Sequence, residues 1–336
     1  MYRRQIMLFF SKYARVYLFI LVSAVSLLGF SQQEPQFTQY MFNRLSYNPA
    51  YAGSNGAICM TGFYRNQWMG LNLMETAGGQ PSTPQTLNFS VDAPITALRG
   101  GIGGTIISDK IGFWSQTFVK LDYAYRFELP TGNLAFGLEA QLFSSSLDRS
   151  KLQGSDQFDD LDNIGSSSDP VLAGSTNDDF LFDLGFGAYY QVPGKLYIGL
   201  SSAKLLETKS EKLNWEHRRH YFVMAGYDWT VPSNPMLRVL PSMLIKTELS
   251  SMQVDASCIL EYNHKFWGGL NYRIQDAISV MGGFSVGGLK FGLAYDLPTS
   301  RLSTQGVGSL DIFLRYCFKV EKAPKPPTSY RNTRRN

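Results

Sequence analysis

The sequence is poor in cysteine, histidine and charge. It has 3 Cys and 3 His among 336 residues, and only 17% of its residues are charged. Three cysteines cannot form a framework of several disulfides, and so few charges exclude a charge-rich disordered protein. After residue 31 no stretch is apolar enough to be a membrane helix. If the mature chain lies in a membrane, it must therefore be a β-barrel, because only helices and closed barrels span a bilayer.

Glycine and aromatic residues are abundant instead. The chain has 31 Gly, 23 Phe and 19 Tyr, and its hydrophobic fraction is 44%. A helical bundle would use more Ala, Glu and Lys, so this composition argues against one.

Residues 1–31 have the pattern of a secretory signal. Four basic residues precede the apolar stretch 16–30, and small residues occupy the −3 and −1 positions of a cut before Gln32. A transmembrane anchor is the alternative, but about 20 apolar residues are needed to span a bilayer. Without these four basic residues, 27 of the 31 Lys and Arg remain against 27 Asp and Glu. The mature chain is neutral, and its charge gives no reason to expect nucleic acid as a partner.

Apolar and polar residues alternate with a period of two along most of the chain. In 117–128, for example, Leu121 and Tyr123 alternate with Lys120 and Asp122. This pattern predicts strands with one apolar face and one face that carries both signs of charge, as in a barrel with lipid outside and a polar lumen. The pattern predicts fourteen strands: 55–66, 85–93, 99–109, 115–128, 133–146, 179–191, 195–204, 218–231, 236–246, 251–262, 265–273, 277–286, 289–298 and 307–319.

The connections between these strands fall into two groups. Every second connection is short, whereas the others include 67–84, 147–178 and 205–217. Short periplasmic turns and long extracellular loops are typical of outer-membrane barrels. The fold prediction is therefore an all-β, transmembrane outer-membrane antiparallel barrel over residues 55–319.

Two segments flank the predicted barrel. Residues 32–54 have roughly helical apolar spacing that ends at Asn48-Pro49, and we expect a short element at or in the periplasmic mouth. Residues 320–336 are basic and contain three prolines, which predicts a disordered periplasmic tail; a docking strip for an acidic periplasmic partner is the alternative.

No residue pattern predicts an enzyme or a cofactor. Ser285 lies in a Gly-x-Ser-x-Gly pattern, but inside an alternating strand on the lumen side, where a catalytic elbow is not expected. His217 and His220 are three residues apart, a spacing that suits zinc on a helix and not at a strand entrance. A weak calcium candidate is an acidic loop that lacks regular ligand spacing and could equally be a solvated loop: Asp156, Asp159, Asp160 and Asp162.

Two cysteines are predicted to meet if the barrel closes between its first and last strands. Residue parity places Cys59 and Cys317 on the lumen face near the periplasmic end of that seam. They are either cross-strand neighbours joined by a disulfide or two free thiols, because a disulfide requires Cα atoms about 4.4–6.8 Å apart.

Several motifs resemble those of the PorP/SprF family of type IX secretion system membrane proteins. The first is PQFTQYMFNRLSYNPAYAGS (35–54), and the second is YRNQWMGL (64–71). Further matches lie at 101–112, 218–229, 240–246, 266–273 and 293–302. The motif residues that we expect to be structurally important are Asn48, Pro49, Ala50, Gly53, Arg65, Gln67, Trp68, Arg219, His220, Tyr221, Arg273, Tyr295 and Asp296. One departure is Gly-Ser-Leu-Asp-Ile at 308–312, where the family pattern leads us to expect a His-Glu pair.

The resemblance implies a non-enzymatic outer-membrane component of protein export and surface display, in some members with gliding motility. Its expected partners are outer-membrane lipid and either the periplasmic ring machinery or the C-terminal sorting domain of a secreted adhesin. The sequence does not separate these two roles. The alternatives are a passive channel or hydrophobic-solute transporter, which the mixed lumen charge permits, and a barrel lipase that uses Ser285.

Overall fold

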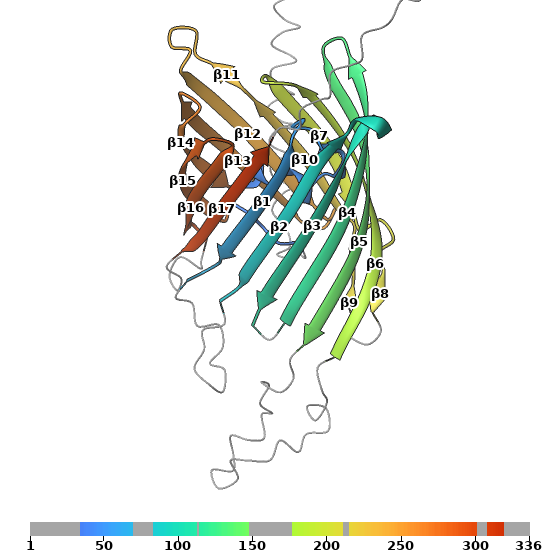
Figure 1. The fold of residues 1–336 in the computed structure, drawn as a ribbon. Helices are drawn as coiled ribbons and strands as arrows, with labels where there is room; N and C mark the ends of the chain where they lie inside the picture. Colours follow the sequence, from blue (N-terminus) through green and yellow to red (C-terminus); the bar gives the residue numbers. More distant parts are fainter. Residues whose placement is uncertain are drawn as a thin grey trace, which may run out of the picture.

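The computed structural model describes residues 34–69, 83–112, 114–147, 177–210, 215–300 and 308–318. They form a closed antiparallel β-barrel of fourteen strands, as the sequence predicts (Figure 1). The barrel strands are β1 (Ile58–Asn66), β2 (Gln85–Ile95), β3 (Gly100–Ile111), β4 (Trp114–Leu129), β5 (Gly132–Leu147), β6 (Asn177–Val192), β7 (Leu196–Ala203), β10 (His220–Tyr227), β12 (Leu237–Thr247), β13 (Met252–Tyr262), β14 (Phe266–Arg273), β15 (Ala277–Val286), β16 (Leu289–Pro298) and β17 (Ser309–Phe318).

The first and last strands close the barrel. β1 pairs along its whole length with β17, and Arg65 lies opposite Asp311 in this register. On the far side β10 pairs with both β7 and β12, so the ring has no open edge. A closed ring is what lipid requires, because an unpaired backbone group in hydrocarbon has no water to bond.

The polar face of the strands is the buried one. On β4 the Lys120 side chain is 1% exposed and the Leu121 side chain is 65% exposed. The same alternation places Asp255 of β13 inside and Leu260 outside. Apolar side chains therefore cover the outer surface of the barrel, where the lipid lies, and the charges line the lumen.

The two ends of the barrel differ in their connections. At one end, here called the turn end, strands are joined by short connections such as 130–131, 193–195 and 287–288. At the other, the loop end, the connections include 67–84, 148–176 and 204–219. By the general rule for outer-membrane barrels the turn end faces the periplasm and the loop end faces the outside.

Three local departures from the predicted strands have physical reasons. The predicted strand 218–231 is interrupted after Tyr227 and resumes as β11 (Trp229–Thr230), because Pro241 on β12 lies opposite this point and has no N–H to donate. Within 205–217 the chain forms a hairpin of β8 (Lys209–Ser210) and β9 (Trp215–Glu216). The first strand begins at Ile58 and not at residue 55, because a turn precedes it.

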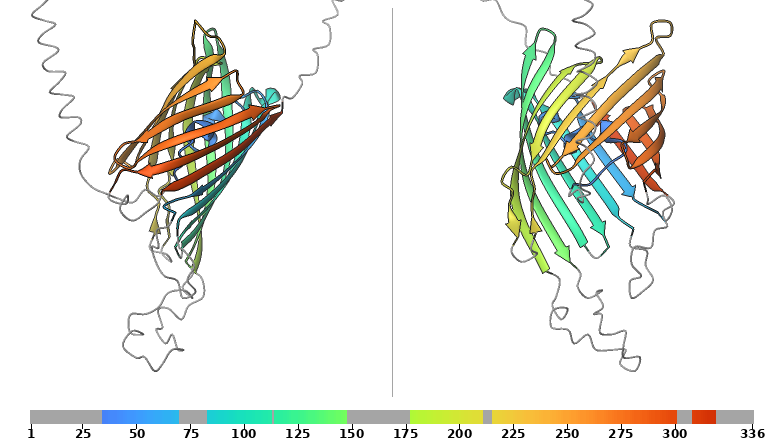
Figure 2. Two further views of the ribbon diagram at one scale, coloured as in Figure 1. Left: turned by 90° about the vertical axis from the view of Figure 1, so that its left-hand side faces the viewer. Right: turned by 180° about the vertical axis from the view of Figure 1, so that it is seen from behind.

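The N-terminal segment lies inside the barrel (Figure 2). Residues 34–54, here called the plug, contain the short 3₁₀ turns η1 (Tyr40–Phe42), η2 (Arg44–Ser46) and η3 (Pro49–Tyr51). The fourth 3₁₀ turn, η4 (Thr96–Leu98), belongs to a connection at the turn end. Barrel wall surrounds the plug, so its aromatic residues are buried on all sides rather than along one helical face.

Some predictions fall outside the described residues. These are the signal at 1–31, the tail at 320–336, the calcium candidate at 156–162 and most of the loops 67–84 and 147–178. Among the residues that the structure does describe, no helix is both long and apolar enough to cross a membrane.

The closing seam carries a pair of cysteines. Cys59 lies opposite Cys317 in the β1–β17 register, their Cα atoms are 4.1 Å apart, and their sulfur atoms are bonded. Cys258 is the free cysteine and lies exposed on the outer face of β13.

We expect thiol counting to report this bond in the native protein. Protein purified and denatured without reductant should show one reactive thiol, that of Cys258, because a disulfide persists under oxidising conditions. Addition of reductant should raise the number to three, the total in the sequence. Three reactive thiols before reduction would contradict a Cys59–Cys317 bond.

Candidate functional site

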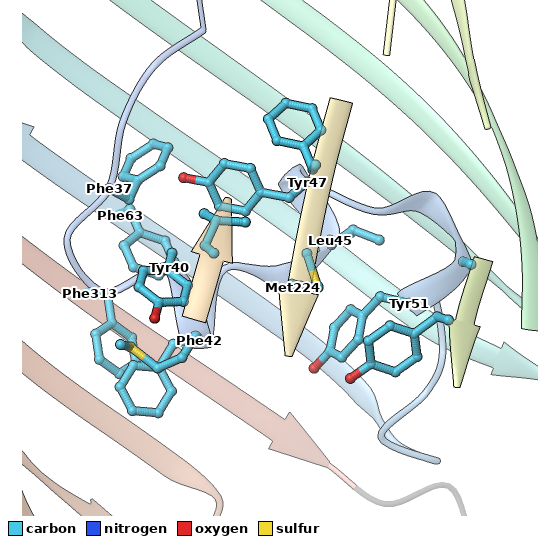
Figure 3. Close-up of a cluster of buried hydrophobic side chains, with 14 of the residues drawn as sticks. Phe37, Tyr40, Phe42, Leu45, Tyr47, Tyr51, Phe63, Met224 and Phe313 are labelled. Carbon is cyan, nitrogen blue, oxygen red and sulfur yellow. The ribbon is translucent and has the colours of Figure 1, made fainter. Parts of the chain in front are cut away.

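The plug packs on the barrel wall through aromatic rings. Figure 3 shows Phe37 beside Phe63, with ring centres 5.4 Å apart, and Phe42 stacked on Phe313 at 4.7 Å. Tyr51 meets Tyr189 of β6 edge to face, with ring centres 5.6 Å apart. These contacts reach strands on opposite sides of the ring, so the plug fills the lumen and fixes the walls against each other.

A buried ionic network joins the plug to the strands next to the seam. The Arg65 guanidinium lies 2.7 Å from an Asp296 carboxylate oxygen and 3.6 Å from Asp311. Thr38 of the plug accepts a hydrogen bond from Arg65 at 2.8 Å and donates its hydroxyl to Asp296 at 2.7 Å. The Thr38 backbone N–H donates to Asp311 at 2.7 Å. A single plug residue thus connects the three charged side chains of the wall.

The network continues around the wall through Arg273. Its guanidinium lies 2.8 Å from Asp255 and 3.6 Å from Asp296, and Lys246 lies 3.2 Å from Asp255. With Arg65 and Asp311, these side chains form three cations and three anions that are nearly excluded from solvent. Buried charges are tolerated when they are paired, so removal of one of these side chains would leave an uncompensated charge in the lumen.

Asn48 clamps the middle of the plug. Its side-chain oxygen accepts the Ala50 N–H at 2.9 Å and caps η3, which begins at Pro49. Its amide nitrogen donates to the Ala188 carbonyl at 3.0 Å and the Leu200 carbonyl at 3.2 Å. The wall can come this close because glycine faces the plug: a Cβ at Gly137 would lie 2.2 Å from the Ala50 nitrogen. A Cβ at Gly187 would lie 2.2 Å from the Asn48 side-chain oxygen.

The plug ends at the turn end of the barrel. The Gly53 N–H donates to Asp92 of β2 at 3.0 Å, and Arg126 of β4 donates to the Ala52 carbonyl at 3.0 Å. Gly53 has φ +67°, and a Cβ there would lie 2.8 Å from the Ala93 carbonyl oxygen. Only glycine combines this backbone conformation with such a close approach.

The first described residues of the plug lie at the loop end. Glu34 pairs with Lys204 at 2.9 Å, directly after β7. Burial acts to raise the pKa of Glu34, but the charges of Lys204 and Lys120 outweigh it and hold the pKa below its usual range. The plug therefore extends beyond the periplasmic mouth and runs down the lumen from the loop end to the turn end.

The two histidines at the loop end, His217 and His220, lie beside different carboxylates. His220 pairs with Glu248 at 2.8 Å, whereas His217 lies 3.5 Å from Asp183. Burial, together with the Lys204 charge, lowers the pKa of His217 to about 4, so its ring is neutral near pH 7. Within the described ranges no group of three or more His, Cys, Asp or Glu side chains is placed to hold a metal ion.

The motif residues divide by position. Eight of them lie in the lumen: Asn48, Pro49, Ala50, Gly53, Arg65, His220, Arg273 and Asp296. Of these, the structure brings Arg65, Arg273 and Asp296 together in the ionic network. Two others, Tyr221 and Tyr295, alternate with buried neighbours and point outward. The remaining three lie at the loop end. Arg219 pairs with Glu207 at 3.4 Å, the Gln67 N–H donates to the Pro84 carbonyl at 2.9 Å, and the Trp68 N–H donates to Ser309 at 3.0 Å.

Sequence reasoning missed the plug's own contacts. Thr38 and Glu34 have no distinguishing local pattern. The carboxylate partners of Thr38 and the Lys204 partner of Glu34 lie more than a hundred residues away. Asp311 lies in the segment that departs from the family pattern, yet it is fully buried in the network. Ser285 lies on the lumen side near the turn end, and its N–H donates to the Lys265 carbonyl as an ordinary strand residue.

Comparison with known proteins gives one family and several structures. Residues 29–316 match the family described as type IX secretion system membrane protein PorP/SprF. The toluene transporter TbuX of Ralstonia pickettii is 12% identical, with 82% of this chain and 93% of that chain covered and a TM-score of 0.48. Omp33 of Acinetobacter baumannii is 5% identical, with 78% and 99% covered and a TM-score of 0.42. No curated protein matches the chain.

Proposed function

This chain belongs to the PorP/SprF family of type IX secretion system membrane proteins, and we propose that it is a closed anchor that binds other proteins at its two ends. Family and fold make it an outer-membrane component of that secretion system. The observation that carries the proposal is the plug, which occupies the lumen from Glu34 at the loop end to Gly53 at the turn end.

The lumen chemistry supports an anchor over a passive channel. A wet pore leaves its charged side chains hydrated, but here Arg65, Asp255, Arg273 and Asp311 are at most 2% exposed. Each of them has an oppositely charged partner within 4 Å. Neutralised, buried pairs fill space and hold the plug. Where these pairs lie, the described lumen offers a solute no row of free charges to follow.

With the lumen occupied, the two ends are the surfaces that remain for partners. The loop end would take the sorting domain of a secreted adhesin, and the turn end would face the periplasmic machinery. The long connections 67–84 and 147–178 join strands that end at the loop end, and long loops are where binding residues usually lie. The described part of this rim includes the β8–β9 hairpin, which carries the exposed Lys209–Glu216 pair.

Deletion of residues 150–176 tests this proposal. We expect an inserted barrel of normal abundance, because the strands on either side stay intact, together with loss of cargo display on the cell surface. Affinity purification from native membranes, with mass spectrometry of the co-eluting proteins, should show the cargo with the full chain and not with the deletion.

Deletion of residues 320–336 is the matched control, because this segment follows β17, which ends at the turn end. Display should continue in that variant. Normal display after the 150–176 deletion would contradict cargo binding at the loop end. Loss of display only after the 320–336 deletion would indicate that the cargo is bound on the periplasmic side instead.

A further inference from the structure

A cavity lies at the turn end between the plug and the barrel wall. Its volume is about 290 Å³. It is bounded by η1, η2 and η3 of the plug, the β6–β7 turn, and the turn-end parts of β10, β12, β13, β16 and β17. This volume is at the lower end of the roughly 300–1,000 Å³ range of ligand pockets. Five of its lining residues are cations: Arg44, Lys195, Arg238, Lys290 and Arg315. Lys195 is exposed in the β6–β7 turn, whereas the other four are at most half exposed.

Two of these cations already have carboxylate partners. Arg238 lies 2.7 Å from Glu261 and also pairs with Asp228. Lys290 lies 3.4 Å from the other oxygen of Glu261 and 4.5 Å from the centre of the Phe42 ring. Asp228 and Glu261, the acidic side chains of the cavity lining, therefore already form ion pairs with Arg238 and Lys290.

Two more of these cations, Arg44 and Arg315, are held by neutral groups. Arg44 lies 3.8 Å from the centre of the Tyr197 ring, and donates to the Tyr189 hydroxyl at 3.2 Å and to the Met41 carbonyl at 2.9 Å. Arg315 donates to the Tyr51 hydroxyl and to Thr61, both at 3.1 Å. In the described part of the chain neither guanidinium has a carboxylate within 4 Å. The charge of Asp92 interacts with that of Arg315 from beyond this distance, and its carboxylate accepts the Gly53 N–H. Two oriented, half-buried guanidinium groups thus face one cavity without a direct carboxylate partner.

We propose that this cavity binds a carboxylate side chain of an acidic peptide segment. The planar donors of Arg44 and Arg315 match a carboxylate, which they would bind by charge-assisted hydrogen bonds. The lining also contains the partly exposed apolar side chains of Val192 and Leu240. A free inorganic anion would leave these apolar side chains uncovered, whereas an apolar residue next to the acidic one would cover them.

The proposal specifies the chemistry of a partner at the turn end. It depends on the proposed function only for the assignment of that end to the periplasm. The cavity and its charges are properties of the folded barrel, so binding by purified protein is measured independently of secretion. Loss of binding would overturn the cavity assignment and leave the anchor function to its own test.

Fluorescence anisotropy of a labelled peptide tests the site. The protein is the full mature chain in detergent micelles, and the probe is a fluorescein-labelled Asp-Phe-Asp-Phe-Asp peptide with an amidated C-terminus. We expect saturable binding that weakens as salt is added, because the groups are partly exposed. Arg315→Gln should weaken the peptide at least about tenfold, which corresponds to about 1.4 kcal/mol.

Matched controls show whether a loss of affinity comes from the cavity or from the overall charge of the protein. Lys265→Gln removes the same charge from an exposed position at the same end, outside the cavity, and should change the affinity less than about twofold. Arg44→Gln should act like Arg315→Gln and serves as the test if the latter does not fold.

Three results would overturn the proposal. The first is equal affinity for the Asn-Phe-Asn-Phe-Asn peptide, and the second is unchanged affinity in the arginine variants. The third is displacement of the peptide by inorganic phosphate at equal concentration, which would assign the cavity to a small anion.

Discussion

Replacement of Arg65 by Met should lower the free energy of unfolding by about 3–5 kcal/mol. The Arg65 guanidinium is 2% exposed and is the cation that Asp296 and Asp311 share with Thr38 of the plug. Without it, Asp311 keeps the Thr38 and Gln39 donors but has no cation within 4 Å among the described residues. A buried carboxylate without its counter-charge is costly, so both barrel and plug lose stability.

Urea unfolding in detergent micelles, followed by tryptophan fluorescence, measures this loss. The control is Lys209→Met, which breaks an ion pair of similar length, 3.0 Å to Glu216, in which both side chains are more than half exposed. An exposed pair contributes only about 0–1 kcal/mol. Equal losses in the two variants would contradict a structural role for the buried network.

A second substitution tests whether the Arg65–Asp296 pair acts as a unit. Arg65→Met combined with Asp296→Leu should cost less than the sum of the two single changes, because neither charge is then left without its direct partner.

The strands could be predicted from the sequence because a single local rule specifies them. A barrel strand has one face in lipid, so Met252, Ala256 and Leu260 alternate with Gln253, Asp255 and Ser257, and the pattern is present in any ten residues. The predicted bounds 277–286 and 289–298 match β15 and β16. The sorting of short and long connections likewise needs only the order of the strands.

The contacts of the plug could not be predicted in this way. Alternation shows that Arg65, Asp296 and Asp311 face inward, but not that Thr38 lies between them. The Asn48-Pro49 pair predicts a chain break, whereas the two carbonyls that Asn48 reaches belong to different strands. Gly137 looks in the sequence like any strand glycine, and its role depends on a backbone that arrives from residue 50.

Replacement of Gly137 by Val should displace the plug. A Cβ at this position would lie 2.2 Å from the Ala50 nitrogen and 2.5 Å from the Pro49 carbonyl carbon, and both are backbone atoms that cannot rotate away. We expect a stability loss of at least about 1–3 kcal/mol from overpacking. We also expect ion conduction in this variant, because the plug would no longer fill the lumen.

Gly104→Val is the matched control. The nearest atom to a Cβ at Gly104 is 3.9 Å away, so the same added side chain meets no plug atom. This variant should fold and stay closed. Equal conductance of the two variants would contradict this explanation. It would mean that an added valine on the barrel opens the lumen without displacing the plug.

Single-channel recording of the wild-type protein in planar bilayers tests the closed lumen most directly. A barrel filled by its own N-terminal segment should insert without a steady open state, and Gly137→Val should conduct under the same voltage and salt. A steady open conductance in the wild type would contradict the anchor and favour a passive channel.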